Sequence, residues 1–507
     1  MDIRFEDEII RIEGCTRAEY SYLLSIYNKY RKNYVFDPMY KKKLWDGIDK
    51  IMKRETKDQI PLSSYFYLKE KFEEVGYTLN ELNDNPLVDK ELDFDEFCEW
   101  VDEFFANADK FPRDYQIKAA YDMIRCKRCM GMLATSAGKT LISFIVFAYL
   151  IMKKDVKNII MIVPSITLVN QSAGDFETYK KKTLLSTRLK VEKTKNGGIP
   201  KHTGIRPTIL VSTFQTACKF DSGVYRDYQA IMVDECHKAV CASIRTILDN
   251  AKNNHIEYRF GLSGTIPDTK YSDGVSLICD IGSIVCKVSA KELQDQDYIS
   301  KVSIAQLRLD YTSEEQKQDL ANAKALLKGQ GKMIDMLQIE KNTVNASQVR
   351  LDYIVKLASQ CPGNVLILFY EIEYGEKLLN TVSSKTEKKA YYIDGEVKGA
   401  LRDEIRHAME TENNTVLIGS FGCVSTGFSL TNLHTVMFVS SYKSESLVLQ
   451  SVGRSLRRNA EIGKTNAKII DVADELYDNC YQIKQADKRV AMYKEQQFPC
   501  KVFRIKL

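Results

Sequence analysis

The sequence lacks the features that would place the protein in a membrane or outside the cell. Its longest apolar run, residues 141–152, holds about twelve residues, whereas a membrane-spanning helix needs about twenty. The amino-terminus has early acidic residues and no apolar segment of signal-peptide length. The 13 cysteines are scattered and odd in number, unlike a secreted disulfide framework. We therefore expect a protein of the cytoplasm (of the host cytoplasm if a phage encodes it), without a membrane partner.

Metal-ligand patterns are also scarce. Cys126 and Cys129 have CxxC spacing, but no second CxxC or HxxxH pattern lies nearby. A structural zinc site needs four ligands, so we expect ordinary cysteines here.

The net charge of +5 is small, so the distribution of charge is more informative than its sum. Residues 28–57 hold ten Lys or Arg against four acids, and residues 81–110 hold eleven acids against two bases. This shift in composition indicates a boundary after a small amino-terminal region. Evenly spaced aromatic residues between Phe94 and Phe105 still predict a packed helix there.

From about residue 111, short apolar runs alternate with helical patterns, which is typical of doubly wound α/β domains with parallel sheets. Two series of such runs occur, separated by residues 291–345, which we read as a strand followed by exposed, charged helices. The runs are 130–133, 159–163, 209–211, 231–233 and 260–262 in the first series, and 365–369, 391–393, 416–418, 436–439 and 469–470 in the second.

A phosphate-binding loop follows the first of these runs and opens an apolar helix. Backbone N–H groups at such a helix start can hold phosphate oxygens. Lys139 would reach the β and γ phosphates, and the Thr140 hydroxyl would bind magnesium. Leu133 departs from the strict pattern, which has glycine there, and a helix start with an incidental lysine is the competing interpretation. The expected nucleotide-binding segment is Thr135, Ser136, Ala137, Gly138, Lys139 and Thr140.

An acidic pair follows the apolar run 230–233. An acid at the end of a buried strand is costly without a partner, so Asp234 is expected to hold magnesium, directly or through water. Glu235 could activate the attacking water as a general base, and His237 could link nucleotide state to neighbouring motifs. The alternative is an exposed acidic turn.

Positive charge for the developing negative charge of phosphoryl transfer could come from the segment Gln450–Arg457. Arg454 and Arg457 are three residues apart, so they share one face of a helix and could act as arginine fingers. A solvated basic helix is an equally good explanation of this segment alone, because Arg458 follows directly.

The order of motifs resembles the superfamily two helicases over residues 110–475. The resemblance implies two tandem RecA-like domains sharing one ATP site, with ATP and Mg²⁺ as cofactors and Gln116 reading adenine. It also implies that Gly427 lies in the ATP site. The matching segments are Arg113–Gln116, Thr135–Thr140, Val163–Ser165, Ser212–Thr216, Asp234–His237, Leu262–Thr265, Val365–Phe369, Ser425–Ser429 and Gln450–Arg458. Many relatives carry an acid at the position of Ser429.

The likeness extends to a recombination and repair helicase of T-even-type phages. It rests on the basic aromatic segment 36–47, on the Thr-Ser-Ala-Gly-Lys loop, and on the insertion 180–206, which has nine Lys or Arg and one acid. It implies an ATP-dependent DNA helicase for forked, Holliday-junction or R-loop DNA in recombination, repair and replication. A monomer is the favoured state. An RNA helicase, the motor subunit of a restriction-type complex and an inactive nucleotide-gated binding module remain alternatives.

The same resemblance predicts the domain plan. We expect an α/β protein with a small α+β nucleic-acid-binding domain at 1–100, RecA-like domains at 101–290 and 291–475, and a carboxy-terminal tail at 476–507.

The expected nucleic-acid contacts lie in the first RecA-like domain and in the amino-terminal region. They would bind phosphates, which carry no sequence information, and the insertion 180–206 is a further candidate. Solvated surface is the alternative for the lysines, and Trp45 beside them is more often a core residue than a base-stacking one. The contact residues are Pro164, Thr213, Gln215, Lys41, Lys42 and Lys43.

Overall fold

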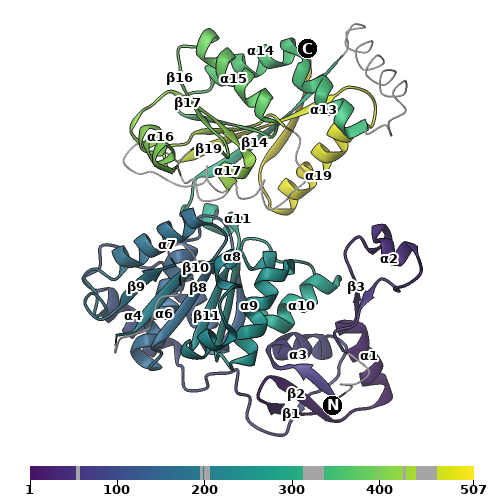
Figure 1. The fold of residues 1–507 in the computed structure, drawn as a ribbon, viewed down its shortest axis with the longest axis vertical. Helices are drawn as coiled ribbons and strands as arrows, with labels where there is room; N and C mark the ends of the chain where they lie inside the picture. The colour runs from purple at the N-terminus through teal and green to yellow at the C-terminus, as the bar shows by residue number, and fades with distance from the viewer. Residues whose placement is uncertain are drawn as a thin grey trace. The chain divides into compact units, whose positions relative to one another are not determined.

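The computed structural model describes residues 1–52, 58–194, 198, 206–311, 336–397, 399–425, 430–440 and 465–507. These residues divide into two compact units, Met1–Val288 and Ser289–Leu507. Each unit is built on one large sheet (Figure 1).

The first unit contains a seven-stranded sheet in which every described strand pair is parallel. Its apolar strands are buried, because helices cover both faces of such a sheet. The order across the sheet is β13 (Ser283–Val288), β7 (Arg128–Leu133), β12 (Tyr258–Ser263), β11 (Ala230–Asp234), β8 (Asn158–Val163), β10 (Thr208–Thr213) and β9 (Lys190–Lys193).

Helices alternate with most of these strands along the chain, as parallel sheets require. One core joins alternate residues of the central strands to α8, α9 and α10. The helices are α4 (Phe94–Phe105), α5 (Asp114–Cys126), α6 (Lys139–Lys153), α7 (Ile166–Tyr179), α8 (Phe214–Ala217), α9 (Ala242–Asn253) and α10 (Ser272–Asp280), with the 3-10 turns η4 (Ser222–Asp227) and η5 (Cys236–Val240).

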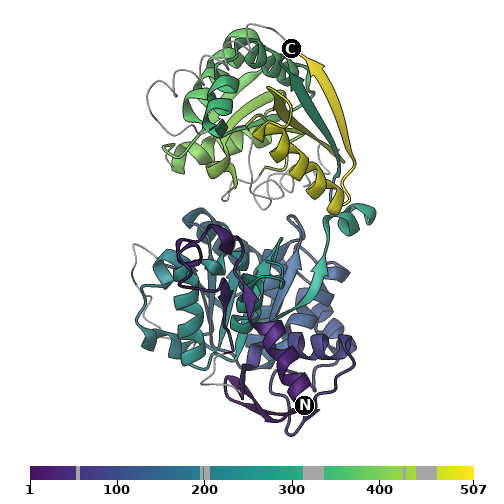
Figure 2. The same ribbon diagram turned by 90° about the vertical axis from the view of Figure 1, so that its right-hand side faces the viewer.

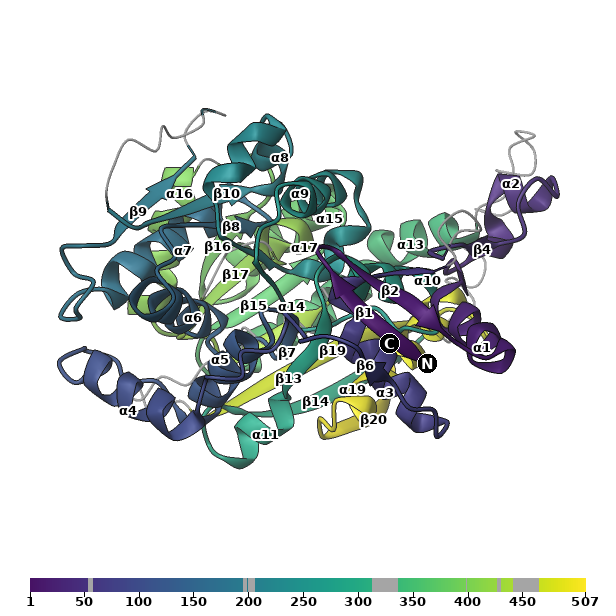
Figure 3. The same ribbon diagram turned by 90° about the horizontal axis from the view of Figure 1, so that it is seen from below.

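The amino-terminal residues form a small four-stranded sheet with two helices (Figure 3). Their apolar side chains belong to the same core as α8, α9 and α10, so this part packs directly on the first parallel-sheet domain. The elements are β1 (Asp2–Glu6), β2 (Ile9–Gly14), α1 (Arg17–Tyr27), β5 (Gln59–Pro61), η3 (Leu62–Ser64), α3 (Tyr65–Glu74) and β6 (Asn80–Glu81).

A projection interrupts this small sheet between α1 and β5, and we call residues 29–50 the arm. It contains β3 (Lys29–Tyr30), η1 (Tyr34–Phe36), α2 (Pro38–Lys41) and β4 (Ile48–Asp49). Strands β3 and β4 pair only with each other in the described chain.

The second unit holds another seven-stranded parallel sheet. In Figure 2 its edge strand β20, in yellow, runs beside β14. The order is β16 (Lys389–Ile393), β17 (Thr415–Ser420), β15 (Val365–Phe369), β18 (Thr435–Phe438), β19 (Asn466–Glu475), β14 (Lys301–Asp310) and β20 (Cys500–Lys506). The helices are α11 (Ala290–Asp295), α13 (Met336–Ala346), α14 (Gln348–Gln360), α15 (Ile372–Lys385), α16 (Gly399–Thr411), α17 (Phe421–Ser425) and α19 (Tyr481–Glu495).

The fold class predicted from the sequence is confirmed: two parallel-sheet domains in tandem, with a small α+β amino-terminal part. Residues 476–507, expected to be a tail, contribute α19 and β20.

Candidate functional site

The phosphate loop lies between β7 and α6, as the sequence predicts. Gly138 adopts φ +81°, and a Cβ there would come within 2.3 Å of the Gln116 side-chain nitrogen. Gln116 Nε2 and the Tyr115 hydroxyl both donate to the Ala137 carbonyl oxygen, each at 2.9 Å. The glycine therefore permits a close approach that fixes the loop against α5, just before Lys139 begins α6.

The predicted lysine and acids meet at the carboxyl end of this sheet. Asp234 is the last residue of β11, and Glu235 follows in the left-handed region at φ +54°. Lys139 Nζ lies 2.8 Å from Glu235 Oε1 and 4.0 Å from Asp234 Oδ1. A non-glycine residue at positive φ stores local strain, which is commonly found at functional sites.

Burial and charge act on these ionisable groups in opposite directions. Burial raises the pKa of Asp234 to about 6, against the lowering effect of Lys139. Burial also opposes ionisation of Glu235, but Lys139 and His237 outweigh it, so the pKa of Glu235 is lowered. The pKa of Lys139 is raised, because Glu235 and Asp234 outweigh its desolvation. The site therefore retains a charged lysine beside a charged glutamate.

The oxygen groups expected to bind magnesium suit that ion. Asp234 Oδ1 is buried and accepts no hydrogen bond from any residue that the structure describes. Thr140 lies in the first turn of α6, which follows the same phosphate loop. Carboxylate and hydroxyl oxygens are the ligands that Mg²⁺ takes, so these residues fit the ion.

His237 connects the acidic pair with the next strand. Its Nδ1 lies 2.8 Å from Ser263 Oγ, at the end of β12, and 3.3 Å from Glu235 Oε2. Ser263 Oγ in turn donates to the Thr265 carbonyl oxygen. One side chain thus contacts both the acidic motif and the Ser-Gly-Thr motif, and its role in linking nucleotide state to these motifs stays a prediction.

The three nucleic-acid candidates of the first parallel-sheet domain differ in exposure. Pro164 is partly buried just before α7, and Gln215 is exposed. Thr213 is 6% exposed, and its hydroxyl caps α8 by accepting from Thr216 N at 3.3 Å. The Thr213 side chain therefore has a local structural role.

The remaining predicted residues fall into two groups. Lys41, Lys42 and Lys43 are exposed on the arm. The residues Gln450, Arg454, Arg457 and Gly427 lie outside the described residues.

The sequence-based list omitted the structural role of Tyr115. Its hydroxyl holds the same carbonyl oxygen as Gln116. The feature of the sequence that points to this role of Tyr115 is its position beside Gln116, in the predicted adenine-binding segment.

No helix in the described part of the chain is both long and apolar enough to span a bilayer.

Comparisons with known proteins agree with this geometry. Residues 109–268 match the family "Type III restriction enzyme, res subunit", and residues 349–459 match "Helicase conserved C-terminal domain". The ATP-dependent DNA helicase UvsW of Enterobacteria phage T4 is 27% identical over 485 residues, covering 94% of this chain and 91% of that protein.

Two solved structures were also compared. The crystal structure of T4 UvsW aligns with 100% of this chain and 99% of its own, with 24% identity and a TM-score of 0.47. The ATP-dependent Type ISP restriction-modification enzyme LlaBIII bound to DNA covers 87% of this chain and 34% of its own, with 17% identity and a TM-score of 0.56. The LlaBIII match supports the fold alone.

A family match falls on each parallel-sheet unit: the res-subunit match covers the Lys139–Asp234–Glu235 site, and the helicase C-terminal match lies on the second unit. The protein is therefore a superfamily two helicase, an ATP-dependent helicase of the UvsW type.

Proposed function

We propose that the protein uses ATP hydrolysis to unwind or branch-migrate forked, Holliday-junction or R-loop DNA in recombination, repair and replication. The observation that carries the proposal is the contact of Lys139 with Glu235 at 2.8 Å, beside Asp234. A lysine at a helix start and two acids at a strand end provide the charges that phosphoryl transfer needs.

In this proposal each residue has one task. Lys139 exchanges its Glu235 contact for the β and γ phosphates, and Glu235 then orients and deprotonates the attacking water. Asp234 and Thr140 hold Mg²⁺, which neutralises phosphate charge when bound. Gln116 reads the adenine, and the backbone of residues 135–140 holds the phosphates.

The carboxy-terminal residues remain predictions from the sequence. We propose that Arg454 and Arg457 supply positive charge to the γ-phosphate, with Gln450 and Gly427 contributing to the same site. The proposed domain bounds are 1–100, 101–290, 291–475 and 476–507.

DNA is proposed as the substrate because the name of the UvsW relative, which covers most of this chain, specifies DNA. We propose Pro164, Gln215 and the arm lysines as contacts to the DNA backbone. We also propose a monomer acting in the cytoplasm, which is the host cytoplasm if a phage encodes the protein. The family match at residues 109–268 favours, as a second candidate, the motor subunit of a restriction-type complex. An RNA helicase is a third candidate, and an RNA–DNA hybrid is included among the proposed substrates of the first.

The test is ATP-dependent unwinding measured in parallel on a fork, a four-way junction, an R-loop and a linear duplex. We expect the three branched substrates to be processed faster than the duplex. Lys139→Ala serves as the inactive control, because it removes the phosphate-binding cation.

ATPase stimulation by forked DNA and by RNA is compared in the same assay. Stimulation by RNA alone would overturn the DNA proposal, and translocation on linear duplex without strand separation would favour the restriction-type motor. Unchanged ATP turnover in Lys139→Ala would contradict the assigned site.

A further inference from the structure

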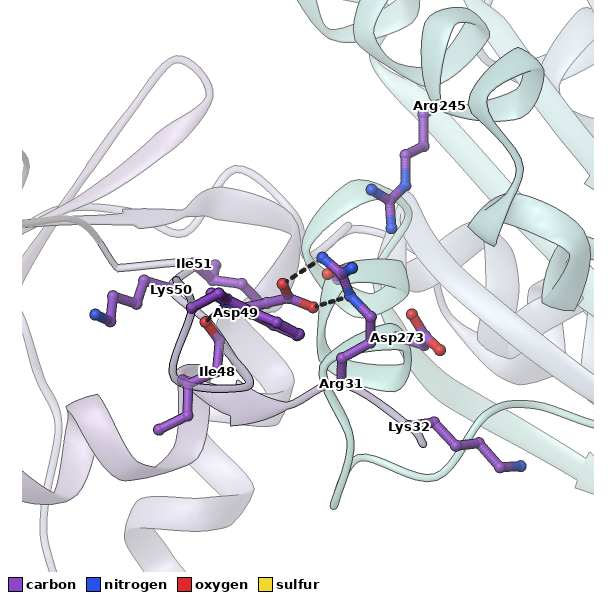
Figure 4. Close-up of a pocket in the computed structure, with 10 residues that line it drawn as sticks. Arg31, Lys32, Ile48, Asp49, Lys50, Ile51, Arg245 and Asp273 are labelled. Atoms are coloured by element: carbon purple, nitrogen blue, oxygen red, sulfur yellow. Dashed lines mark hydrogen bonds and ion pairs between the residues drawn. The ribbon is translucent and has the colours of Figure 1, made fainter. Parts of the chain in front are cut away.

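A pocket of about 770 Å³ opens between the arm and the helices α9 and α10 (Figure 4), and we call it the arm pocket. The arm lines it with Arg31, Lys32, Trp45 and Lys50, and α9 contributes Arg245. Figure 4 shows the Arg245 side chain extending from its helix towards Arg31 and Asp49. Basic residues of the arm and of α9, which are distant in the sequence, therefore line the same pocket.

A shared carboxylate fixes this geometry. Asp49 accepts from Arg31 Nη2 at 2.7 Å and Nε at 3.1 Å, and from Ser272 Oγ at 2.6 Å. Ser272 is the first residue of α10, so Asp49 joins the arm to that helix. Arg31 also lies 4.6 Å above the Trp45 ring, and Trp45 Nε1 donates to the Ile48 carbonyl oxygen at 2.9 Å.

The charge of the pocket is only partly compensated. Arg31 is paired with Asp49, and Lys50 with Asp46 at 3.0 Å. Asp273 of α10 also lines the pocket, and Arg245 acts electrostatically on Asp49 and Asp280. Within the described ranges, however, neither Lys32 nor Arg245 forms an ion pair with an acidic side chain. Two exposed cations thus remain available to an anion, and the planar guanidinium of Arg245 suits a phosphate.

The shape favours a polymer over a small ion. A second cavity of about 680 Å³ continues along the arm and shares Trp45 and Lys50 with the first. Lys41 and Lys43 line this second cavity, with Leu44 exposed beside them. Cations spaced along two joined cavities can follow successive phosphates, and Trp45 can contact a sugar or base.

We propose that the arm pocket binds the phosphodiester backbone of DNA, with Lys32 and Arg245 as the two principal contacts. The inference rests on the proposed DNA helicase function. It names a DNA-binding site outside the helicase motifs.

The position of Arg245 gives the site a route to the ATPase centre. A small internal cavity beside the arm pocket is lined by Arg245, Asp273 and His237. His237 in turn contacts Glu235 and Ser263. Arg245 and His237 therefore line the same small cavity, and we expect DNA held by Arg245 to stimulate ATP hydrolysis.

The experiment compares wild-type protein with Lys32→Gln, Arg245→Gln and the double variant. Fluorescence anisotropy gives the affinity for labelled forked DNA at several salt concentrations. We expect about tenfold weaker binding in the double variant, and a salt slope smaller by about one for each cation removed. The DNA concentration for half-maximal ATPase stimulation rises in the double variant.

Lys153→Gln is the matched control. Lys153 is exposed at the carboxyl end of α6, about 20 Å along that helix from the phosphate loop, and its loss should leave affinity and salt slope unchanged.

Three outcomes overturn the assignment. The first is wild-type affinity and salt slope in the double variant, while the wild-type protein binds forked DNA. The second is an equal loss in Lys153→Gln. The third is thermal stabilisation by inorganic phosphate or a deoxynucleoside monophosphate alone that disappears in Arg245→Gln, which would identify a small anion as the ligand. Failure of the wild-type protein to bind any forked DNA would instead refute the proposed function.

Discussion

Gln116 donates a hydrogen bond of 2.9 Å from its side-chain amide to the carbonyl oxygen of Ala137, inside the phosphate loop. Its own amide oxygen accepts from the backbone nitrogen of Arg113 at 3.0 Å. The residue proposed to read adenine therefore also anchors the loop that is proposed to hold the phosphates. A change at Gln116 is therefore expected to affect both the recognition of the base and the shape of the phosphate loop.

We predict that Gln116→Ala raises the KM for ATP about tenfold, which corresponds to the loss of about 1.4 kcal/mol. The loop loses one of its two anchors, and adenine loses its hydrogen-bonding partner. Steady-state ATPase kinetics with ATP and GTP measure both effects, since discrimination against GTP should also decrease.

Tyr115→Phe is the control, because it removes the other donor to Ala137 and leaves Gln116 intact. It should raise the KM less and preserve the preference for ATP. Unchanged KM and base preference in Gln116→Ala would contradict the assigned role.

A buried ion-pair cluster joins the amino-terminal sheet to the first parallel sheet. Glu8 binds Arg128 with contacts of 2.9 and 3.0 Å, and it also binds Arg259, whose side chain is fully buried. Burial and the neighbouring Arg259 lower the pKa of Arg128 to about 10. Glu8→Ala removes the carboxylate that forms ion pairs with both buried arginines, so we predict a loss of about 3 kcal/mol in the free energy of unfolding. Urea denaturation followed by circular dichroism measures it.

Glu13→Ala is the comparison, because Glu13 pairs with Arg4 at the surface of the same sheet. Exposed pairs contribute little, so this variant should unfold close to the wild-type midpoint. Equal losses in the two variants would show that the Glu8 cluster has no special importance.

Asp280, at the end of α10, should make stability depend on pH. Burial raises the pKa of Asp280 to about 6, against the lowering effect of Lys252. An unfolded aspartate has a pKa of about 3.9, so the folded protein binds this proton more tightly. Stability from this group is therefore complete below about pH 4 and is lost as the pH rises through about 6.

We predict that Asp280→Asn stabilises the protein by about 2 kcal/mol at pH 7.5, a value reduced for partial solvent exposure. The gain should shrink towards zero near pH 4.5, as measured by urea unfolding at both pH values. Asp227→Asn, at an exposed position, should show no such trend. A gain that is equal at both pH values would contradict the pKa assignment.

Arg457→Ala tests the proposed arginine finger. We expect ATP binding to persist and kcat to fall by at least about 100-fold, because the arginine is needed where charge develops in the transition state. Fluorescent-nucleotide titration and single-turnover hydrolysis separate the two quantities. Arg458→Ala is the matched control in the same segment, and a loss of binding with normal residual catalysis would reassign Arg457.

The sequence predicted those strands that are buried on both faces. Strands β8 and β11 are continuous apolar runs because helices cover both sides of the sheet. The edge strands β9 and β20 were missed, since Lys190–Lys193 and Cys500–Lys506 are rich in charged and exposed side chains. An edge strand buries less surface, so its sequence resembles a loop.

The site was predictable where chemistry is local, as at Lys139 and at Asp234 with Glu235. The Glu8–Arg259 pair was not, because 251 positions separate its members and single charges are common in this sequence. Arg245 was missed for a related reason: only the folded arm brings Lys32 and Trp45 near α9.

The Glu8 cluster affects whether the first parallel-sheet domain can be separated from the amino-terminal part. Arg128 begins β7, which leads to the phosphate loop, and Arg259 lies in β12, which leads to Ser263. A protein truncated by its first hundred residues would keep both arginines in these strands without their Glu8 partner. It would also expose the apolar surface that the amino-terminal part shares with the first parallel-sheet domain. We therefore expect that the amino-terminal part cannot be removed without loss of stability unless both arginines are replaced by apolar residues.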